Sequence, residues 1–125
     1  MKILIVEDNP MLLKALSNTF QKAGFQFLSA IDGLQAKEIF DSQQPDMVVS
    51  DLMLPFVTGL ELIEYIRDTE EQYTKIVALS SMKTEDTINL AFDLGVDDYI
   101  IKPYIASELV ARTRRLQKWN ISSNN

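Results

Sequence analysis

Short apolar runs of strand length alternate five times with stretches of helical periodicity, and this alternation constrains the fold more than any other feature of the chain. The predicted strands span residues 3–6, 25–30, 47–50, 76–79 and 99–101. After the first of them, Leu12, Leu16 and Phe20 recur at helical spacing. Such repetition predicts an α/β fold of five βα units, in which a doubly wound parallel sheet carries helices on both faces.

Capping residues mark several boundaries of the predicted helices. Pro10 stands where the first turn of the first helix is expected, which is a favoured position for proline. Gly24 and Gly95 are expected to end the first and fourth helices. Thr84 is expected to begin the fourth helix, and Ser107 to be the N-cap of the fifth.

Length and composition fit one domain of a globular protein. The chain has 125 residues, 46% of them apolar, and a net charge of −6. We place the domain at residues 1–119 and expect residues 120–125 to form a flexible C-terminal tail. A negative net charge disfavours direct nucleic-acid contact, and no apolar run approaches the ~18 residues that a bilayer requires.

Two residue types are missing. The chain has no cysteine, which excludes disulfides and thiolate chemistry and agrees with a cytoplasmic location. It also has no histidine, so Ser-His-Asp hydrolysis and histidine metal ligation are excluded.

Chemically capable side chains follow four of the five predicted strands. Glu7 and Asp8 follow the first, Asp51 the third, Ser80 the fourth and Lys102 the fifth. Ligands of open α/β sheets bind beyond the carboxyl ends of the strands, where the strand order reverses. In a flavodoxin-like order, 2-1-3-4-5, the first and third strands are neighbours, which brings the three carboxylates into one cleft.

Electrostatics indicates what such a cleft is for. Two like charges about 4 Å apart repel by roughly 4 kcal/mol at an effective dielectric of 20, so three clustered carboxylates require a cation. Mg²⁺ prefers carboxylate oxygens, and Lys102 supplies a fixed positive charge. A magnesium ion, an amine and the Ser80 hydroxyl together suit a phosphoryl group, and Asp51 is a candidate nucleophile for it.

Each of these residues has a simpler interpretation when it is taken alone. Glu7 and Asp8 suit a helix N-terminus, and Asp51 could be a loop acid or an N-cap. Ser80 is a common turn residue, and Lys102 a common solvated lysine. Only their joint placement at one edge of the sheet favours the phosphoryl site.

The motifs that carry these residues resemble those of the response-regulator receiver domains of two-component signalling. The matching segments are I-L-I-V-E-D-N, D-L-M-L-P-x-x-x-G, L-S-S and G-V-D-D-Y-I-I-K-P-Y, and the similarity runs from Lys2 to about Lys118. The segment A-S-E-L-V-A-R-T-R-R-L is most similar to the receivers of winged-helix transcription regulators.

The resemblance implies roles for the residues of the predicted metal site. It makes Glu7 and Asp8 the acidic pair that helps to hold Mg²⁺, for which Mn²⁺ can substitute. It makes Asp51 the phosphoacceptor, and Met53 the residue whose backbone carbonyl joins the metal shell. Phe56 departs from the family, because a glycine is common at that position.

Three further residues correspond to the switch of the family. The resemblance makes Ser80 and Lys102 the residues that bind the phosphoryl group, and Tyr99 the aromatic residue that moves inward on activation. It also implies a cis peptide bond between Lys102 and Pro103.

The same resemblance implies a possible homodimer through the face formed by the fourth helix, the fifth strand and the fifth helix. Asp97, Asp98, Glu108 and Arg112 match charged members of that face. The segment 87–89, however, offers Thr, Ile and Asn where a basic partner for Glu108 would be expected.

We therefore expect a phosphorylation-activated switch, not a classical enzyme, whose phosphoryl donor is a histidine kinase or a phosphotransfer protein and whose altered face controls an output such as transcription. The alternative is an adaptor of the same fold that binds partners without phosphorylation. A flavin carrier is disfavoured because E-D-N-P would repel a bare phosphate. An aspartate-dependent phosphatase is disfavoured because it needs a second acid where Met53 stands.

Overall fold

The computed structural model describes residues 1–119, which form five βα units in sequence. The strands are β1 (Lys2–Val6), β2 (Gln26–Ala30), β3 (Met47–Asp51), β4 (Lys75–Ser80) and β5 (Asp98–Ile101). The helices are α1 (Pro10–Lys22), α2 (Gly33–Gln43), α3 (Gly59–Thr69), α4 (Glu85–Leu94) and α5 (Ala106–Lys118). The predicted alternation is therefore confirmed along the described chain.

The strands form one parallel sheet in the order β2-β1-β3-β4-β5, as predicted. β1 and β3 are neighbours in the middle of the sheet, with Val6 paired to Ser50. This register brings the residues that follow β1 beside Asp51, the last residue of β3. The strand order reverses at this point, which is where ligands of such sheets bind.

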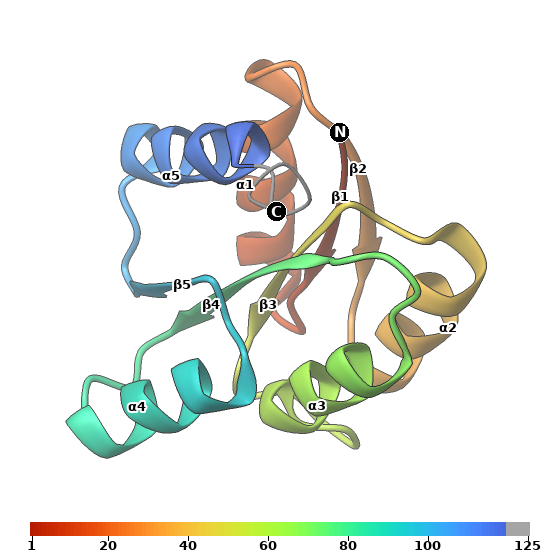
Figure 1. The fold of residues 1–125 in the computed structure, drawn as a ribbon. Helices are drawn as coiled ribbons and strands as arrows, with labels where there is room; N and C mark the ends of the chain where they lie inside the picture. Colours follow the sequence, from red (N-terminus) through yellow and green to blue (C-terminus); the bar gives the residue numbers. More distant parts are fainter. Residues whose placement is uncertain (120–125) are drawn as a thin grey trace.

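Two hydrophobic layers cover the two faces of the sheet. Figure 1 shows α1 and α5 on one side of the sheet and α2, α3 and α4 on the other. Alternate residues of each central strand point to opposite layers: in β1, Leu4 packs in the layer of α2 to α4, whereas Ile3 and Ile5 pack in the layer of α1 and α5. The strands that lead to the predicted site are therefore packed against helices on both faces of the sheet.

The predictions for the helix ends are confirmed at α4 and wrong at the start of α5. Ser107 is not the N-cap of α5: the helix begins at Ala106, and Ile105 occupies the cap position without a side-chain hydrogen bond. The predictions for Thr84 and Gly95 are confirmed, because these residues cap the two ends of α4. The predicted tail, residues 120–125, lies outside the described residues. No helix within residues 1–119 is both long and apolar enough to cross a membrane.

Candidate functional site

Three carboxylates gather at the carboxyl edge of the sheet. Carboxylate oxygens of Glu7, Asp8 and Asp51 all lie within 4.8 Å of one another. Glu7 and Asp51 are buried, at 1% and 6% exposed, whereas Asp8 is open to solvent. The pairing of β1 with β3 creates this cluster, because it sets the chain after Val6 against the end of β3. The structure thus brings together the three acids that were predicted to share a cleft.

Lys102 links the two buried acids. Its Nζ lies 2.9 Å from Glu7 Oε1 and 2.8 Å from Asp51 Oδ2, so one ammonium group donates to both carboxylates. Burying charges is tolerable only when they are paired and hydrogen-bonded, and this arrangement satisfies that condition. The peptide bond that follows, between Lys102 and Pro103, is cis.

The pKa values of this pair reflect burial and mutual attraction. Burial raises the pKa of Glu7 above its ordinary value, although hydrogen bonds from Lys102 and from the Asn9 N–H act in the opposite direction. Burial by itself would lower the pKa of Lys102, but its hydrogen bonds to Asp51 and Glu7 outweigh that effect and raise the pKa. Lys102 therefore stays charged throughout the physiological range of pH.

The donor set fits a hard divalent cation. Three carboxylates of one cluster are more than Mg²⁺ commonly takes from a protein, and the exposure of Asp8 leaves room for the waters that Mg²⁺ retains. Both oxygens of Glu7 already accept hydrogen bonds, from Lys102 and from the Asn9 N–H at 3.1 Å. Both oxygens of Asp51 accept hydrogen bonds as well, from the Met53 N–H and from Lys102. Direct ligation by either buried acid therefore requires one of these bonds to give way, whereas the exposed Asp8 is the most accessible ligand of the three.

Asp8→Asn is expected to raise the stability of the metal-free protein. The mutation removes one of three clustered charges, and we expect the free energy of unfolding to rise by about 1 kcal/mol after allowance for solvent screening. The loss of a favourable charge at the N-terminus of α1, worth about 0.3–1 kcal/mol, opposes this gain and limits it. Urea denaturation in EDTA measures the change.

The same variant should lose most of the stabilisation that MgCl₂ gives to the wild type, because a ligand stabilises only the state that binds it. Asp68→Asn, which neutralises an exposed acid of α3, is the matched control and should keep the response to MgCl₂. An Asp8→Asn protein that responds to MgCl₂ like the wild type would exclude Asp8 as a ligand.

The loop after β3 holds Asp51 in place. The Met53 N–H donates to Asp51 Oδ1 at 3.0 Å, and the Gly59 N–H donates to the Leu52 carbonyl at 3.0 Å. A Cβ atom on Gly59 would overlap the Asp51 carbonyl, so the start of α3 can approach the site this closely only with glycine. Thr58 begins α3 through a reciprocal capping box with Glu61, a T-x-x-E pattern that is visible in the sequence.

Ser80 and Tyr99 meet at one backbone residue. The Met82 N–H donates to Ser80 Oγ at 3.0 Å, and the Tyr99 hydroxyl donates to the Met82 carbonyl at 2.7 Å. Ser80 is fully buried, and its carbonyl accepts from the Lys102 N–H at 2.8 Å. Both predicted switch residues thus lie beside the strand end that carries Lys102, and the ring of Tyr99 is turned inward, at 8% exposed.

Asn9 supports the site and was missed by the sequence reasoning. Its side-chain oxygen accepts from the backbone N–H groups of Met11 and Leu12, which caps α1, while its own N–H holds Glu7. The signal was available, because an asparagine directly before a proline at the first helical position is a strong N-cap pattern.

The residues predicted for the dimer face are already paired within the chain. Arg112 Nη1 lies 2.9 Å from Asp98 Oδ1, and Arg112 Nη2 lies 2.9 Å from Glu108 Oε1. Asp97, the residue directly before Asp98, instead accepts from Arg67 and from the Ile76 N–H, in a separate network at the amino edge of the sheet. A dimer through these charges would therefore have to rearrange pairs that the single chain has formed.

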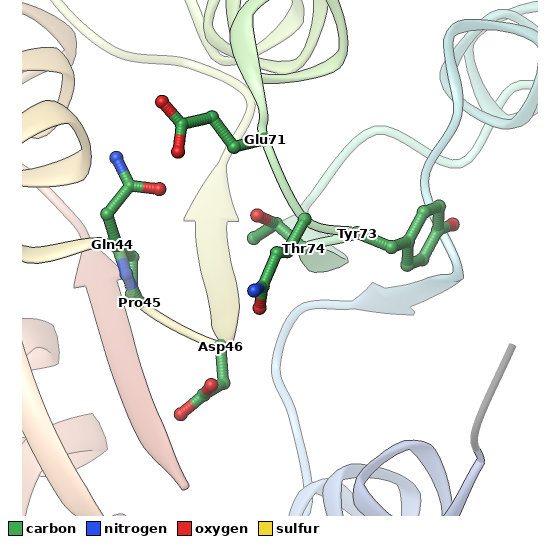
Figure 2. Close-up of a pocket in the computed structure, with 7 residues that line it drawn as sticks. Gln44, Pro45, Asp46, Glu71, Tyr73 and Thr74 are labelled. Carbon is green, nitrogen blue, oxygen red and sulfur yellow. The ribbon is translucent and has the colours of Figure 1, made fainter. Parts of the chain in front are cut away.

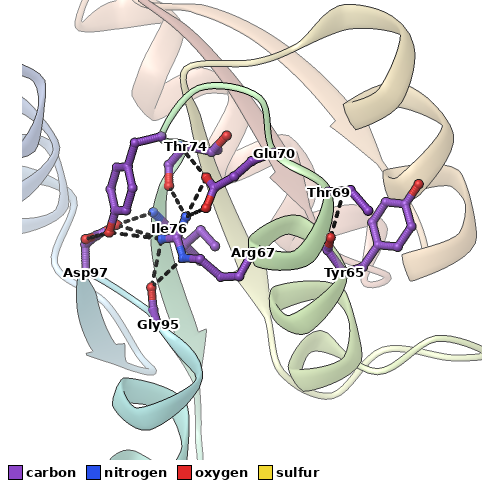
Figure 3. A network of polar contacts seen from close by, with 9 residues as sticks. Tyr65, Arg67, Thr69, Glu70, Thr74, Ile76, Gly95 and Asp97 are labelled. Carbon is purple, nitrogen blue, oxygen red and sulfur yellow. Dashed lines mark hydrogen bonds and ion pairs between the residues drawn. The ribbon is translucent and has the colours of Figure 1, made fainter. Parts of the chain in front are cut away.

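Arg67 is the centre of that network at the amino edge of the sheet (Figure 3). Its guanidinium donates to the carbonyls of Gly95 and Thr74, at 2.8 and 2.6 Å, and pairs with Glu70 and Asp97. The C-terminus of α4 is thereby fixed to the C-terminal end of α3. The hollow shown in Figure 2 lies at the same edge, lined by Gln44, Pro45, Asp46, Glu71, Gln72, Tyr73 and Thr74, at the other end of β3 from Asp51.

The Tyr73 hydroxyl is expected to ionise at a higher pH than that of an ordinary tyrosine. Burial raises its pKa, and so does the hydrogen bond that its hydroxyl donates to Asp97. A raised pKa in the folded state gives a stabilising contribution that is present below the ordinary tyrosine pKa and is lost as the pH rises through the folded value. Tyr73→Phe should lower the free energy of unfolding by about 1 kcal/mol at neutral pH.

The difference in the free energy of unfolding between Tyr73→Phe and the wild type should vanish in strong alkali, where Tyr73 is ionised in both the folded and the unfolded state. In an absorbance titration, Tyr73→Phe should also lack the tyrosinate component that appears at the highest pH. Tyr104→Phe is the control and should retain that component. If the tyrosinate component with the highest pKa survived in Tyr73→Phe, that component would not belong to Tyr73.

Comparison with protein families identifies the whole arrangement. The family model described as the response regulator receiver domain matches residues 3–114. The chain is 33% identical over 117 residues to the DNA-binding dual master transcriptional regulator RpaA of Synechocystis, which covers 92% of this chain and 48% of that protein. It is 36% identical over 115 residues to the transcriptional activator protein PfeR of Pseudomonas aeruginosa, which covers 92% of this chain and 37% of that protein. The chain thus spans about half, or less, of the length of these relatives.

Solved structures agree with this result. The BeF₃-activated N-terminal receiver domain of Klebsiella pneumoniae RstA superposes with a TM-score of 0.88 at 28% identity, covering 95% of this chain and 100% of that one. The receiver domain of the Francisella response regulator 1452 gives the same TM-score at 26% identity, covering 94% and 96%. With three carboxylates and a bridging lysine at the reversal point of a 2-1-3-4-5 sheet, the chain belongs to the response regulator receiver domain family.

Proposed function

We propose that this receiver domain is a phosphorylation-activated signalling switch in which Asp51 accepts the phosphoryl group. The observation that carries the proposal is the Lys102 ammonium, which bridges the buried Glu7 and Asp51 beside the exposed Asp8. A lysine between two buried acids at the ligand-binding edge of the sheet is an arrangement that a phosphoryl group can enter, because the phosphoryl oxygens replace one carboxylate as the partner of the amine.

The donor in this proposal is the phosphohistidine of a histidine kinase or of a phosphotransfer protein. An Asp51 carboxylate oxygen attacks the phosphorus, the P–N bond breaks, and the imidazole leaves with the electron pair while an acyl phosphate forms. When bound by Asp8, Asp51 and the Met53 carbonyl, Mg²⁺ (or Mn²⁺) would neutralise charge on the phosphoryl oxygens. Lys102 orients the group through one of these oxygens, and later attack of water on phosphorus regenerates the Asp51 carboxylate.

In this proposal the backbone of Met82 connects the two switch residues, Ser80 and Tyr99. Ser80 Oγ accepts from the Met82 N–H and keeps its own proton available for a phosphoryl oxygen, while Tyr99 holds the Met82 carbonyl. A phosphoryl group on Asp51 would draw Ser80 and Lys102 toward itself and stabilise the conformation of the β4–α4 loop in which Tyr99 lies inward. The population of one α4-β5-α5 surface would thereby increase over another.

The output of the switch is proposed from the relatives. RpaA and PfeR are named as transcriptional regulators, and the chain matches about half of the first and somewhat less of the second. We propose that the α4-β5-α5 face controls such an output in the cytoplasm, with homodimerisation as one route and with no direct contact between this domain and nucleic acid. Because Arg112 is paired with Asp98 and Glu108 within the chain, a dimer through these residues would form only when the pairs exchange partners.

Incubation with acetyl phosphate and MgCl₂, followed by intact-mass measurement, tests the proposal. We expect a mass gain of one phosphoryl group that EDTA abolishes. Absence of any gain would instead favour an adaptor that binds its partners without phosphorylation.

A further inference from the structure

Large apolar side chains stand exposed a few residues after each strand end that carries a residue of the acid cluster, Ser80 or Lys102. We call them the apolar rim: Met11, Met53, Phe56, Met82 and Ile105. Met11 and Phe56 are each 83% exposed. Large apolar side chains that stand exposed beside a polar site are typical of a surface that another protein covers.

Phe56 is held in an unfavourable backbone conformation. Its φ is +68°, and the Val57 N–H donates to the Pro55 carbonyl at 2.9 Å, which closes a three-residue turn with Phe56 in its middle. A γ-turn with positive φ at its central residue is rare and strained, and a bulky side chain increases the strain. Burial of the Phe56 ring does not offset this strain, because the ring lies in solvent.

The surrounding chain is braced well enough to hold this strain. Leu52 and Leu54 are buried and fix the loop to the core. On the side of α2, a Cβ atom on Gly33 would overlap Val57, so the first turn of that helix packs directly against the residue after Phe56. Strain that persists in an over-determined loop beside a reactive group is grounds for a functional hypothesis about the strained residue.

We infer that Phe56 is an anchor residue through which a histidine-phosphorylated protein docks over Asp51, with the apolar rim as its footprint. The inference rests on the proposed function. A small phosphodonor is an anion that gains nothing from exposed apolar side chains and is repelled by the acid cluster, whereas a protein with an apolar docking face buries the rim. A membrane surface is disfavoured, because the net charge of −6 and the acids at this edge repel anionic lipid.

The test compares two phosphodonors on one set of variants. One donor is acetyl phosphate. The other donor is a histidine kinase that has been autophosphorylated with ATP. It is chosen from the purified histidine kinases of the same genome as the one that phosphorylates the wild type fastest. The variants are Phe56→Gly, which removes both ring and strain, Phe56→Leu, which keeps an apolar side chain, and Gln44→Gly. Gln44 is the matched control, because it also has a positive φ, +47°, but lies at the opposite edge of the sheet (Figure 2).

We expect Phe56→Gly to melt about 3 °C above the wild type, to accept from acetyl phosphate within about twofold of the wild-type rate, and to accept from the kinase about tenfold more slowly. Phe56→Leu should retain most of the transfer from the kinase, and Gln44→Gly should accept from both donors as the wild type does. The signature is thus a more stable protein that is impaired only toward a protein donor.

Each other outcome overturns a defined statement. If Phe56→Gly accepted from the kinase at the wild-type rate, Phe56 would not be an anchor residue. Equal losses of rate with both donors would place Phe56 in the chemistry instead of the docking. A melting temperature below that of the wild type would show that the backbone at Phe56 is not strained. Labelling of the wild type by acetyl phosphate but by no kinase would overturn this inference alone. Labelling by neither donor would overturn the proposed function itself.

Discussion

Asp51→Asn should reduce phosphorylation by acetyl phosphate to background. An amide is not a nucleophile toward phosphorus, so the acyl phosphate cannot form, whereas the size and shape of the side chain hardly change. The fold should survive, because the mutation removes both the ion pair with Lys102 and the repulsion from Glu7 and Asp8, and these effects oppose each other. Intact-mass measurement after incubation with MgCl₂ reports the result, and circular dichroism confirms the fold.

Asp46→Asn is the matched control for this experiment. Asp46 precedes the same strand, but it lies at the amino edge, where it accepts from the Lys2 N–H at 2.7 Å. Its replacement should leave phosphorylation at the wild-type level. A phosphoryl mass gain that persists in Asp51→Asn would mean that another side chain is the acceptor, and the proposed roles of Lys102 and Ser80 would have to be reconsidered with it.

Lys102→Ala should have the largest effect on stability. The mutation leaves the two buried carboxylates of Glu7 and Asp51 facing each other with no shared ammonium group. Removing one partner of a buried ion pair typically costs about 3–5 kcal/mol, and we expect a loss of about 3 kcal/mol here in EDTA, since Lys102 is partly exposed. Urea denaturation measures it.

The size of this loss should depend on the metal. MgCl₂ should recover part of it, because a divalent cation then offsets the same carboxylates. Lys83→Ala, an exposed lysine before α4, is the control and should change the stability by no more than about 0.5 kcal/mol. Identical losses in Lys102→Ala with and without MgCl₂ would show that the lysine and the metal do not share a site. Phosphorylation should also slow, because the amine no longer orients the phosphoryl oxygens.

Much of the fold follows from patterns that a single sequence displays. The short apolar runs of the strands and the 3.6-residue period of the helices are local, and so are caps such as Thr84 and Gly95, which begin and end α4 as expected. Ser107 shows where local signals are weakest: a good capping residue stands in the sequence, yet the cap position of α5 is Ile105, two residues earlier. Packing of the helix against the sheet outweighs a single hydrogen bond, so element boundaries are the least certain feature of such predictions.

The chain itself determined that Glu7, Asp8, Asp51, Ser80 and Lys102 end neighbouring strands, because apolar strand cores leave polar residues only at their ends. Tertiary structure alone decided which atoms pair. Lys102 meets Glu7 across 95 positions of sequence and Asp51 across 51, Asp97 turns inward to Arg67, and Phe56 is forced into a strained turn. Side-chain partners depend on positions fixed within a few ångströms by several elements at once, and no local pattern encodes those positions.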